Sequence, residues 1–165
     1  MITLSLIGSL LSSFMLLFTI FYGLYKNYHD RILRYYSYFG LCAFGILFTM
    51  FLTYAFPNEL DLTLVNKITQ ASTVLTFSAL FVLSLIFPKT EKQVPFLVIT
   101  IILVPAYIIA YIAVFTDMNI TAAYFKDGKL VREFRFFYTV YLSVAFGYVL
   151  LGVINFIRKY ITTKV

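Results

Sequence analysis

Residues 94–116 read VPFLVITIILVPAYIIAYIAVFT, a stretch without a single charged side chain. About 20 residues of α-helix, each rising about 1.5 Å, cross the hydrocarbon core of a bilayer. Four further stretches contain 21 to 24 residues each and no Asp, Glu, Lys, Arg or His. The sequence therefore predicts five transmembrane helices, the other four being residues 2–25, 35–56, 68–88 and 136–157.

The composition of the whole chain points the same way. Its 165 residues are 62% apolar and 12% charged, whereas soluble domains are about 45–50% apolar and about 25% charged. A small domain leaves much of its surface in water, so this composition argues against a soluble enzyme, a disordered tail and a nucleic-acid module. The apolar stretches lack period-two alternation and are about twice as long as a barrel strand. We therefore expect an all-α membrane protein, a single transmembrane domain over residues 1–165, with the lipid bilayer and no nucleic acid as partner.

Positive charges are distributed unevenly between the two sets of loops and chain ends. One set carries eight Lys or Arg and two acidic residues, and the other carries five of each. Lys and Arg are enriched in cytoplasmic loops. We therefore expect a multi-pass protein of the inner or plasma membrane, with its N-terminus outside and its C-terminus in the cytoplasm. The eight basic residues are Lys26, Arg31, Arg34, Lys89, Lys92, Arg158, Lys159 and Lys164.

The outer loop before the last helix contains a turn signal. Asp127 and Gly128 form an Asp-Gly pair, which suits a two-residue turn because both central residues need positive φ. The pattern predicts a β-hairpin over about residues 120–134, the alternative being a disordered loop. A lone hairpin is marginally stable, so we expect it to rest on the helix ends or the lipid surface. The expected pairs are Tyr124 with Val131 and Phe125 with Leu130.

Two features inside the apolar stretches could belong to a ligand site. Thr69, Ser72, Thr73 and Thr76 recur at three- and four-residue spacing and share one helix face. They either contact a neighbouring helix, with their hydroxyls bonded to the backbone, or line a small polar pocket that opens outward. Pro105 removes one hydrogen bond from the middle of its helix and predicts a kink, which serves either packing or a ligand-lined bend.

Motifs for catalysis, cofactors and metals are absent from the sequence. The single histidine, His29, lies in a basic loop with only Asp30 beside it. Charges inside a membrane usually mark function, and their absence from all five stretches argues against a pump or channel. A carrier of neutral or lipid-like molecules stays compatible with the pattern. We expect no enzyme activity, no catalytic residue, no cofactor and no metal in this chain.

Two segments carry a resemblance to a known family. Residues 76–88 read TFSALFVLSLIFP and lead into a short basic turn, and residues 124–141 hold the Lys-Asp-Gly-Lys turn before an aromatic helix start. This arrangement resembles the first five helices of the N-terminal seven-helix membrane region of bacterial sensor histidine kinases and related signalling proteins. The resemblance implies two further helices and a cytoplasmic output domain beyond residue 165, unless the chain is a stand-alone relative.

The leading hypothesis is therefore a membrane sensor or receptor-like module. An outer or membrane-buried ligand would shift the packing of the third to fifth helices, and a cytoplasmic signalling domain or partner would read the shift. Alternatives are an oligomeric carrier, a protein that binds lipids or small apolar ligands, and a structural subunit of a membrane complex. A homo-oligomer is compatible with small residues four apart, because they let helices approach closely. These pairs are Gly8 with Ser12 and Ser143 with Gly147.

Overall fold

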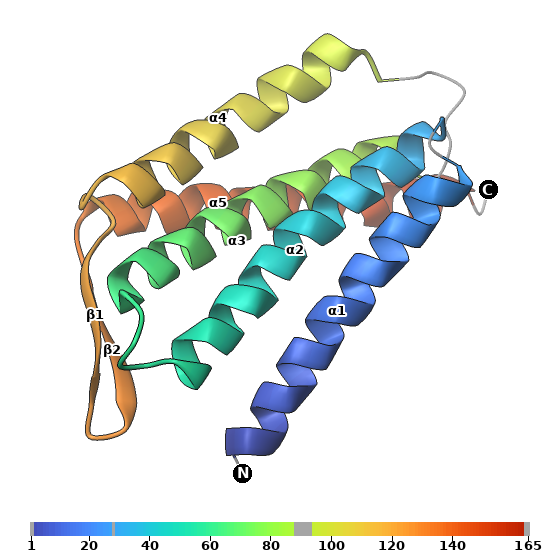
Figure 1. Ribbon diagram of the computed structural model, residues 1–165. Helices are drawn as coiled ribbons and strands as arrows, with labels where there is room; N and C mark the ends of the chain where they lie inside the picture. Colours follow the sequence, from blue (N-terminus) through green and yellow to red (C-terminus); the bar gives the residue numbers. More distant parts are fainter. Residues whose placement is uncertain (1, 28, 88–93, 164–165) are drawn as a thin grey trace.

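The computed structural model describes residues 2–27, 29–87 and 94–163 of the chain (Figure 1). All five described helices are long and apolar enough to cross a membrane, and a two-stranded antiparallel hairpin joins the fourth to the fifth. The prediction of an all-α, multi-pass membrane protein is confirmed. The elements are α1 (Ile2–Lys26), α2 (Arg31–Ala55), α3 (Leu62–Ile86), α4 (Phe96–Phe115), β1 (Ile120–Lys126), β2 (Lys129–Phe134) and α5 (Phe137–Thr163).

Two helices begin earlier than the apolar stretches do, and aspartates explain both starts. Asp30 accepts a hydrogen bond of 2.8 Å from an amide in the first turn of α2. Asp61 accepts two, of 2.9 and 3.1 Å, from the first turn of α3. Aspartate is a favoured N-cap because its carboxylate satisfies amides that have no partner within the helix. The expected start at residue 68 is therefore six residues late, and the first turns of α3 include the buried polar residues Asn66 and Lys67.

The remaining helix ends differ less from the prediction. Helix α3 ends at Ile86, and the expected end at Pro88 lies outside the described residues. Helix α4 is shorter than residues 94–116 by two residues at its start and one at its end. Helix α5 continues to Thr163, six residues past the end of its apolar stretch. Basic residues end a hydropathic pattern without ending a helix, since Lys and Arg are good helix formers.

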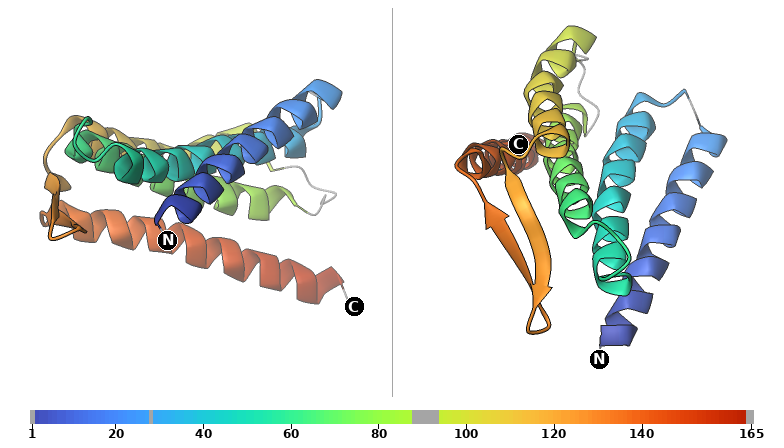
Figure 2. Two further views of the ribbon diagram at one scale, coloured as in Figure 1. Left: turned by 60° about the horizontal axis from the view of Figure 1, so that its bottom comes forward. Right: turned by 60° about the vertical axis from the view of Figure 1, so that its left-hand side comes forward.

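Helix α3 is the centre of the bundle. It packs against α2, α4, α5 and β1, whereas α4 and α5 contact each other only slightly. Helix α1 packs along α2 at the edge of the bundle (Figure 2). Helix α3 is therefore in contact with most of the other elements. The buried core cluster comes from α3, α4 and α5 and consists of Ala71, Val74, Ala106, Ile109, Ala110, Tyr141, Ala145 and Tyr148.

The glycines that bring helices together are not the ones that the sequence singled out. A Cβ on Gly40 would lie 2.7 Å from the side chain of Ile20, and a Cβ on Gly45 would lie 2.5 Å from the hydroxyl of Ser72. Both distances are shorter than van der Waals contact, so α1–α2 and α2–α3 approach closely at these points. A Cβ on Gly8 or Gly147 would meet nothing within 4 Å.

The hairpin has the predicted turn and register. Tyr124 pairs with Val131, and Phe125 pairs with Leu130. Asp127 and Gly128 have φ values of 51° and 73°, the left-handed conformation that a tight two-residue turn needs. Strand β1 packs against α3, as expected for a hairpin that needs support from a helix end.

Candidate functional site

Two of the four hydroxyls predicted as a polar face of α3, those of Thr69 and Ser72, lie at its contact with α2. The Thr69 hydroxyl is 2.8 Å from the Thr49 hydroxyl of α2 and 2.9 Å from a carbonyl one turn back in α3. Ser72 faces Gly45 of α2. Thr73 and Thr76 donate to carbonyls four residues back, at 2.8 and 2.7 Å. None of the four lines the three cavities described below, and the choice between a packing face and a ligand face stays a prediction.

Pro105 lies inside α4 on a face that is exposed in the bundle. Close to it, the hydroxyl of Tyr148 on α5 donates to the carbonyl of Ile102, at 2.5 Å. Proline removes the hydrogen bond to the carbonyl four residues back, that of Ile101, and the bond from Tyr148 lies at the next carbonyl of the same turn. Pro105 itself lines none of the three cavities, and the region around it contacts α5.

A network of polar side chains joins the hairpin to the outer end of α3. The Nε atom of Arg132 on β2 donates to Oδ1 of Asn66, at 2.6 Å. Between α4 and β1, Asn119 donates through its amide nitrogen to Oε1 of Gln70. Two segments that are far from α3 in the sequence are thereby tied to that helix. We call this set the outer polar cluster, after the side of the membrane on which the sequence analysis expects the hairpin. It consists of Asn66, Lys67, Gln70, Asp117, Asn119 and Arg132.

An ion pair completes the outer polar cluster. The Nζ atom of Lys67 lies 2.6 Å from Oδ1 of Asp117, and the two side chains are 11% and 68% exposed respectively. The hydrogen bond and positive charge of Lys67 lower the pKa of the Asp117 carboxyl below its usual value. Burying an ammonium group is costly without a partner, so this pairing is what permits Lys67 to lie within α3.

The amides of the cluster are more deeply buried than its ion pair. Asn66 is 2% exposed and Asn119 is fully buried. Within the described residues, Oδ1 of Asn119 has no hydrogen-bond partner. The hydroxyl of Tyr141 on α5 donates to the backbone carbonyl of Gln70, at 3.2 Å. The cluster therefore extends from the hairpin through α3 to α5.

Sequence reasoning missed most of this cluster because it began the third helix at residue 68. Asp61 could have indicated the true start, because an N-cap at this position begins the helix at residue 62. Thr63, Asn66, Lys67 and Gln70 then share a face at three- and four-residue spacing. In the structure, the Thr63 hydroxyl on that face accepts a hydrogen bond of 3.2 Å from a backbone amide of β1.

The predicted hairpin residues have separate roles. Phe125 contacts Tyr54 of α2 edge to face, with ring centroids 5.9 Å apart. Phe125 and Gly128 help to line an outer cavity of about 580 Å³ between the hairpin and the outer ends of α1 and α2. Tyr124 donates to the Glu133 carboxylate at 3.2 Å, and this bond raises the pKa of the Tyr124 phenol. The hairpin thus supplies part of a cavity wall as well as a turn.

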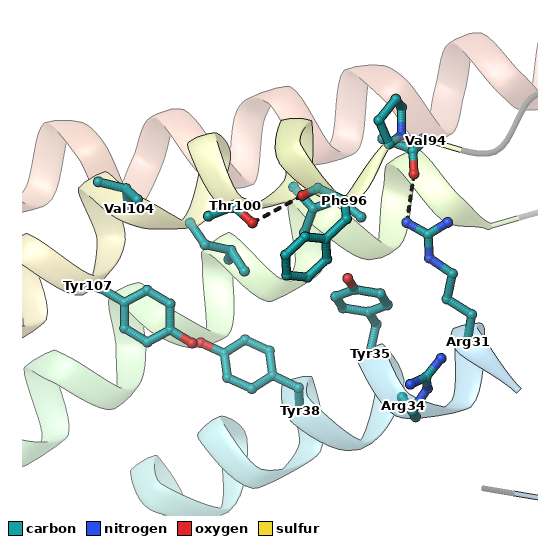
Figure 3. Close-up of a pocket in the computed structure, with 12 residues that line it drawn as sticks. Arg31, Arg34, Tyr35, Tyr38, Val94, Phe96, Thr100, Val104 and Tyr107 are labelled. Atoms are coloured by element: carbon teal, nitrogen blue, oxygen red, sulfur yellow. Dashed lines mark hydrogen bonds between the residues drawn. The ribbon is translucent and has the colours of Figure 1, made fainter. Parts of the chain in front are cut away.

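A larger cavity lies at the opposite end of the bundle, between α2 and α4. Its volume is about 720 Å³, and Figure 3 shows two arginines and two tyrosines of α2 facing α4 across it. Arg31 donates to the backbone carbonyl of Val94, at 2.6 Å. We call it the basic cavity, and it is lined by Arg31, Arg34, Tyr35, Tyr38, Val94, Pro95, Phe96, Ile99, Thr100, Leu103, Val104 and Tyr107.

The lining of the basic cavity follows helical spacing that sequence reasoning did not use. Arg31, Arg34 and Tyr38 are three and four residues apart on α2. A third cavity, of about 600 Å³, lies beside α4 and is lined by apolar residues and two tyrosines. Within the described residues, no group of three His, Cys, Asp or Glu is placed to hold a metal ion.

Compared with protein-family models, with curated proteins and with solved structures, the chain gives no match. The class of the protein is therefore defined by its fold and site alone. It is a multi-pass helical membrane protein with a small hairpin that is hydrogen-bonded to the central helix. The resemblance to the membrane region of sensor histidine kinases stays a prediction.

Proposed function

We propose that the protein is a membrane-embedded sensor module in which the hairpin receives a signal and α3 carries it across the membrane. The observation that supports this most is that α3 is tied to neighbouring elements at both of its ends. The outer polar cluster ties one end to the hairpin. At the other end, Asn155 of α5 donates to the carbonyl of Ser84 at 2.7 Å, and Lys159 donates to the carbonyl of Leu85 at 2.8 Å.

These two sets of bonds make α3 a rigid connection. At a rise of about 1.5 Å per residue, its 25 residues are long enough to cross a bilayer. Coupling between distant sites travels through rigid elements and hydrogen-bond networks that have more than one arrangement. A signal that moves the hairpin would act on Asn66 through Arg132, and α3 would displace the inner half of α5.

The orientation follows from the charges. We place the hairpin outside the cell and the arginine-rich end in the cytoplasm, in an inner or plasma membrane. A signalling domain or partner would then read the position of α5 on the cytoplasmic side. A cysteine that replaces Lys129, in a Cys42→Ser background, should react with a membrane-impermeant maleimide on intact cells. Protection of this cysteine until the cells are opened would reverse the orientation.

The coupling itself can be measured by the distance between two spin labels. The labels are attached to cysteines introduced by Tyr36→Cys on α2 and Ile157→Cys on α5, two exposed positions near the inner end of the bundle. Cys42→Ser removes the native thiol. In nanodiscs, Arg132→Gln should shift or broaden the distance distribution between the two labels. Lys129→Gln removes a positive charge from the same hairpin without touching α3 and should leave it unchanged. Identical distributions in the two variants would contradict coupling through Arg132.

Binding of a lipid-like ligand is the second candidate function, and the basic cavity favours it. Its volume of about 720 Å³ lies within the usual range of small-molecule sites, about 300–1,000 Å³. Its two walls come from helices that both pack on α3. A ligand there would contact the same central helix as the hairpin does, so binding and sensing are compatible.

A further inference from the structure

We propose that the basic cavity binds an amphiphile with an anionic head group and a long acyl chain. The head group lies against Arg31 and Arg34, and the chain runs between α2 and α4 toward the middle of the membrane. This inference rests on the second candidate function, ligand binding, and adds the site and the chemistry of the ligand.

The two arginines supply the head-group end. Both line the cavity from the first turn of α2 (Figure 3). In the described part of the chain neither arginine forms an ion pair. Arginine has five N–H donors in a planar fork that matches carboxylate and phosphate oxygens. The bond from Arg31 to the Val94 carbonyl uses one of these donors, and the fork retains others for an anion.

The wall beyond the arginines is suited to a hydrocarbon chain. Ile99, Leu103 and Val104 line it from α4, and the ring of Tyr107 continues the same face. From Phe96 to Tyr107 the α4 wall extends about 16 Å, at about 1.5 Å per residue. A small hydrophilic anion would leave this apolar length unfilled, whereas an acyl chain would cover it.

Two tyrosine hydroxyls add a polar point to the wall of the cavity. Tyr38 of α2 and Tyr107 of α4 both line it. Figure 3 shows their hydroxyls pointing toward each other. A phenol hydroxyl can both donate and accept a hydrogen bond, so one hydroxyl of the pair can donate to the other while the second donates to a carbonyl or ester oxygen of a ligand.

The place of the cavity agrees with an anionic membrane component. It lies at the end of the bundle with the excess of Lys and Arg, and the cytoplasmic leaflet is the one rich in anionic lipids. Helices α2 and α4 both pack on α3 and contact each other little. A bound amphiphile would therefore bridge two helices that α3 otherwise holds apart.

Pairs of ligands that have matching acyl chains and head groups of different net charge test the inference directly. The purified full chain in detergent micelles is titrated with palmitate or hexadecanol, and with phosphatidylglycerol or phosphatidylcholine, and bound ligand is counted by native mass spectrometry. We expect the anionic member of at least one pair to bind about tenfold tighter than its neutral partner, the effect of hydrogen bonds to a charged group. Whether palmitate or phosphatidylglycerol binds better then distinguishes a free fatty acid from a lipid head group.

Three variants locate the binding. Arg34→Gln should reduce anionic binding about tenfold, and Val104→Phe should reduce it by filling the acyl wall. Arg158→Gln removes an exposed arginine of α5 at the same end of the bundle and should leave binding unchanged. A circular dichroism melt confirms that each variant is folded, and Val104→Phe tests the site separately from the charge.

Two outcomes would overturn the inference. If neither anionic ligand binds tighter than its neutral partner and Val104→Phe weakens the binding of all four, the cavity takes apolar ligands and the anionic head group is wrong, while ligand binding stands. If Arg34→Gln and Val104→Phe both bind like Arg158→Gln, the ligand lies elsewhere and the basic cavity is not its site.

Discussion

The outer polar cluster and the basic cavity both bring charged side chains to helix ends, and they treat those charges in opposite ways. In the outer polar cluster Lys67 is paired with Asp117, and Arg132 is bonded to Asn66. In the basic cavity two arginines face an open volume of about 720 Å³. Charges that are paired within the chain have their partners inside the fold, and removing one partner leaves the other uncompensated. Charges that face a cavity are available to something else. The comparison separates a cluster that holds the hairpin to α3 from a cavity that we propose binds a ligand.

The largest expected effect comes from breaking the amide pair of the outer polar cluster. Gln70→Leu leaves the buried amide nitrogen of Asn119 without its partner, which costs about 1–3 kcal/mol of unfolding free energy. Unfolding in detergent–denaturant mixtures, followed by circular dichroism, measures this loss. The double variant Gln70→Leu with Asn119→Leu should recover part of it, because no donor is then left unpaired. A double variant whose loss equals the sum of the two single losses would show that the two amides do not interact.

The next effect should appear in the hairpin. Arg132→Gln removes the charged donor to Asn66, so β2 should open more often and its amide protons should exchange about tenfold faster. Hydrogen exchange measured by mass spectrometry over residues 129–134 reports this rate. Lys129→Gln at the turn is the matched control and should exchange like the native chain. Equal exchange in both variants would mean that other contacts hold the hairpin.

A much smaller change in stability is expected at the basic cavity. Arg34→Gln alters an exposed side chain, so the free energy of unfolding should stay within about 0.5 kcal/mol of the native value. The same unfolding assay measures it, in the absence of added lipid. A loss as large as that of Gln70→Leu would show that Arg34 is part of the fold, and the contrast between the two regions would fail.

The smallest effect concerns pH. Lys67 lowers the pKa of Asp117, so the ionised carboxylate stabilises the folded state above the usual aspartate pKa of about 3.9. This contribution is lost as the pH falls through the lowered value in the folded state. Asp117 is exposed, so the contribution is small. Stability measured between about pH 5 and about pH 2 should fall slightly less in Asp117→Asn than in the native chain. A steeper fall of stability in Asp117→Asn would contradict a stabilising role of the ionised Asp117 carboxylate.

Local patterns in the sequence were enough for the elements. Uncharged stretches longer than 20 residues identified all five described helices. In a bilayer such a stretch satisfies its backbone hydrogen bonds within itself only as a helix. The Asp127-Gly128 pair fixed the turn, and with it the register of Tyr124 and Phe125. Both depend on residues that are close together in the chain.

The candidate sites depend on residues that are far apart, and the sequence did not predict them. Arg132 and Asn66 are separated by 66 positions, and Arg31 and Val94 by 63. Helical spacing shows which residues share a face, but it does not show which helix that face meets. For the same reason the sequence did not identify Gly40 and Gly45 as helix contacts. Gly40 is the point where α2 approaches α1, and Gly45 is the point where α2 approaches α3.

The distances along the chain also order the assembly of the bundle during synthesis. Helices α1 and α2 are neighbours in sequence and can pair as soon as both are inserted. The bonds of α3 to α5, from Tyr141 to Gln70 and from Asn155 to Ser84, each span 71 positions. Until the last helix leaves the ribosome, the face of α3 that receives Tyr141 and Asn155 is not yet covered by α5. The central helix is thus the last to be completed, and a chaperone or insertase would find its exposed face there.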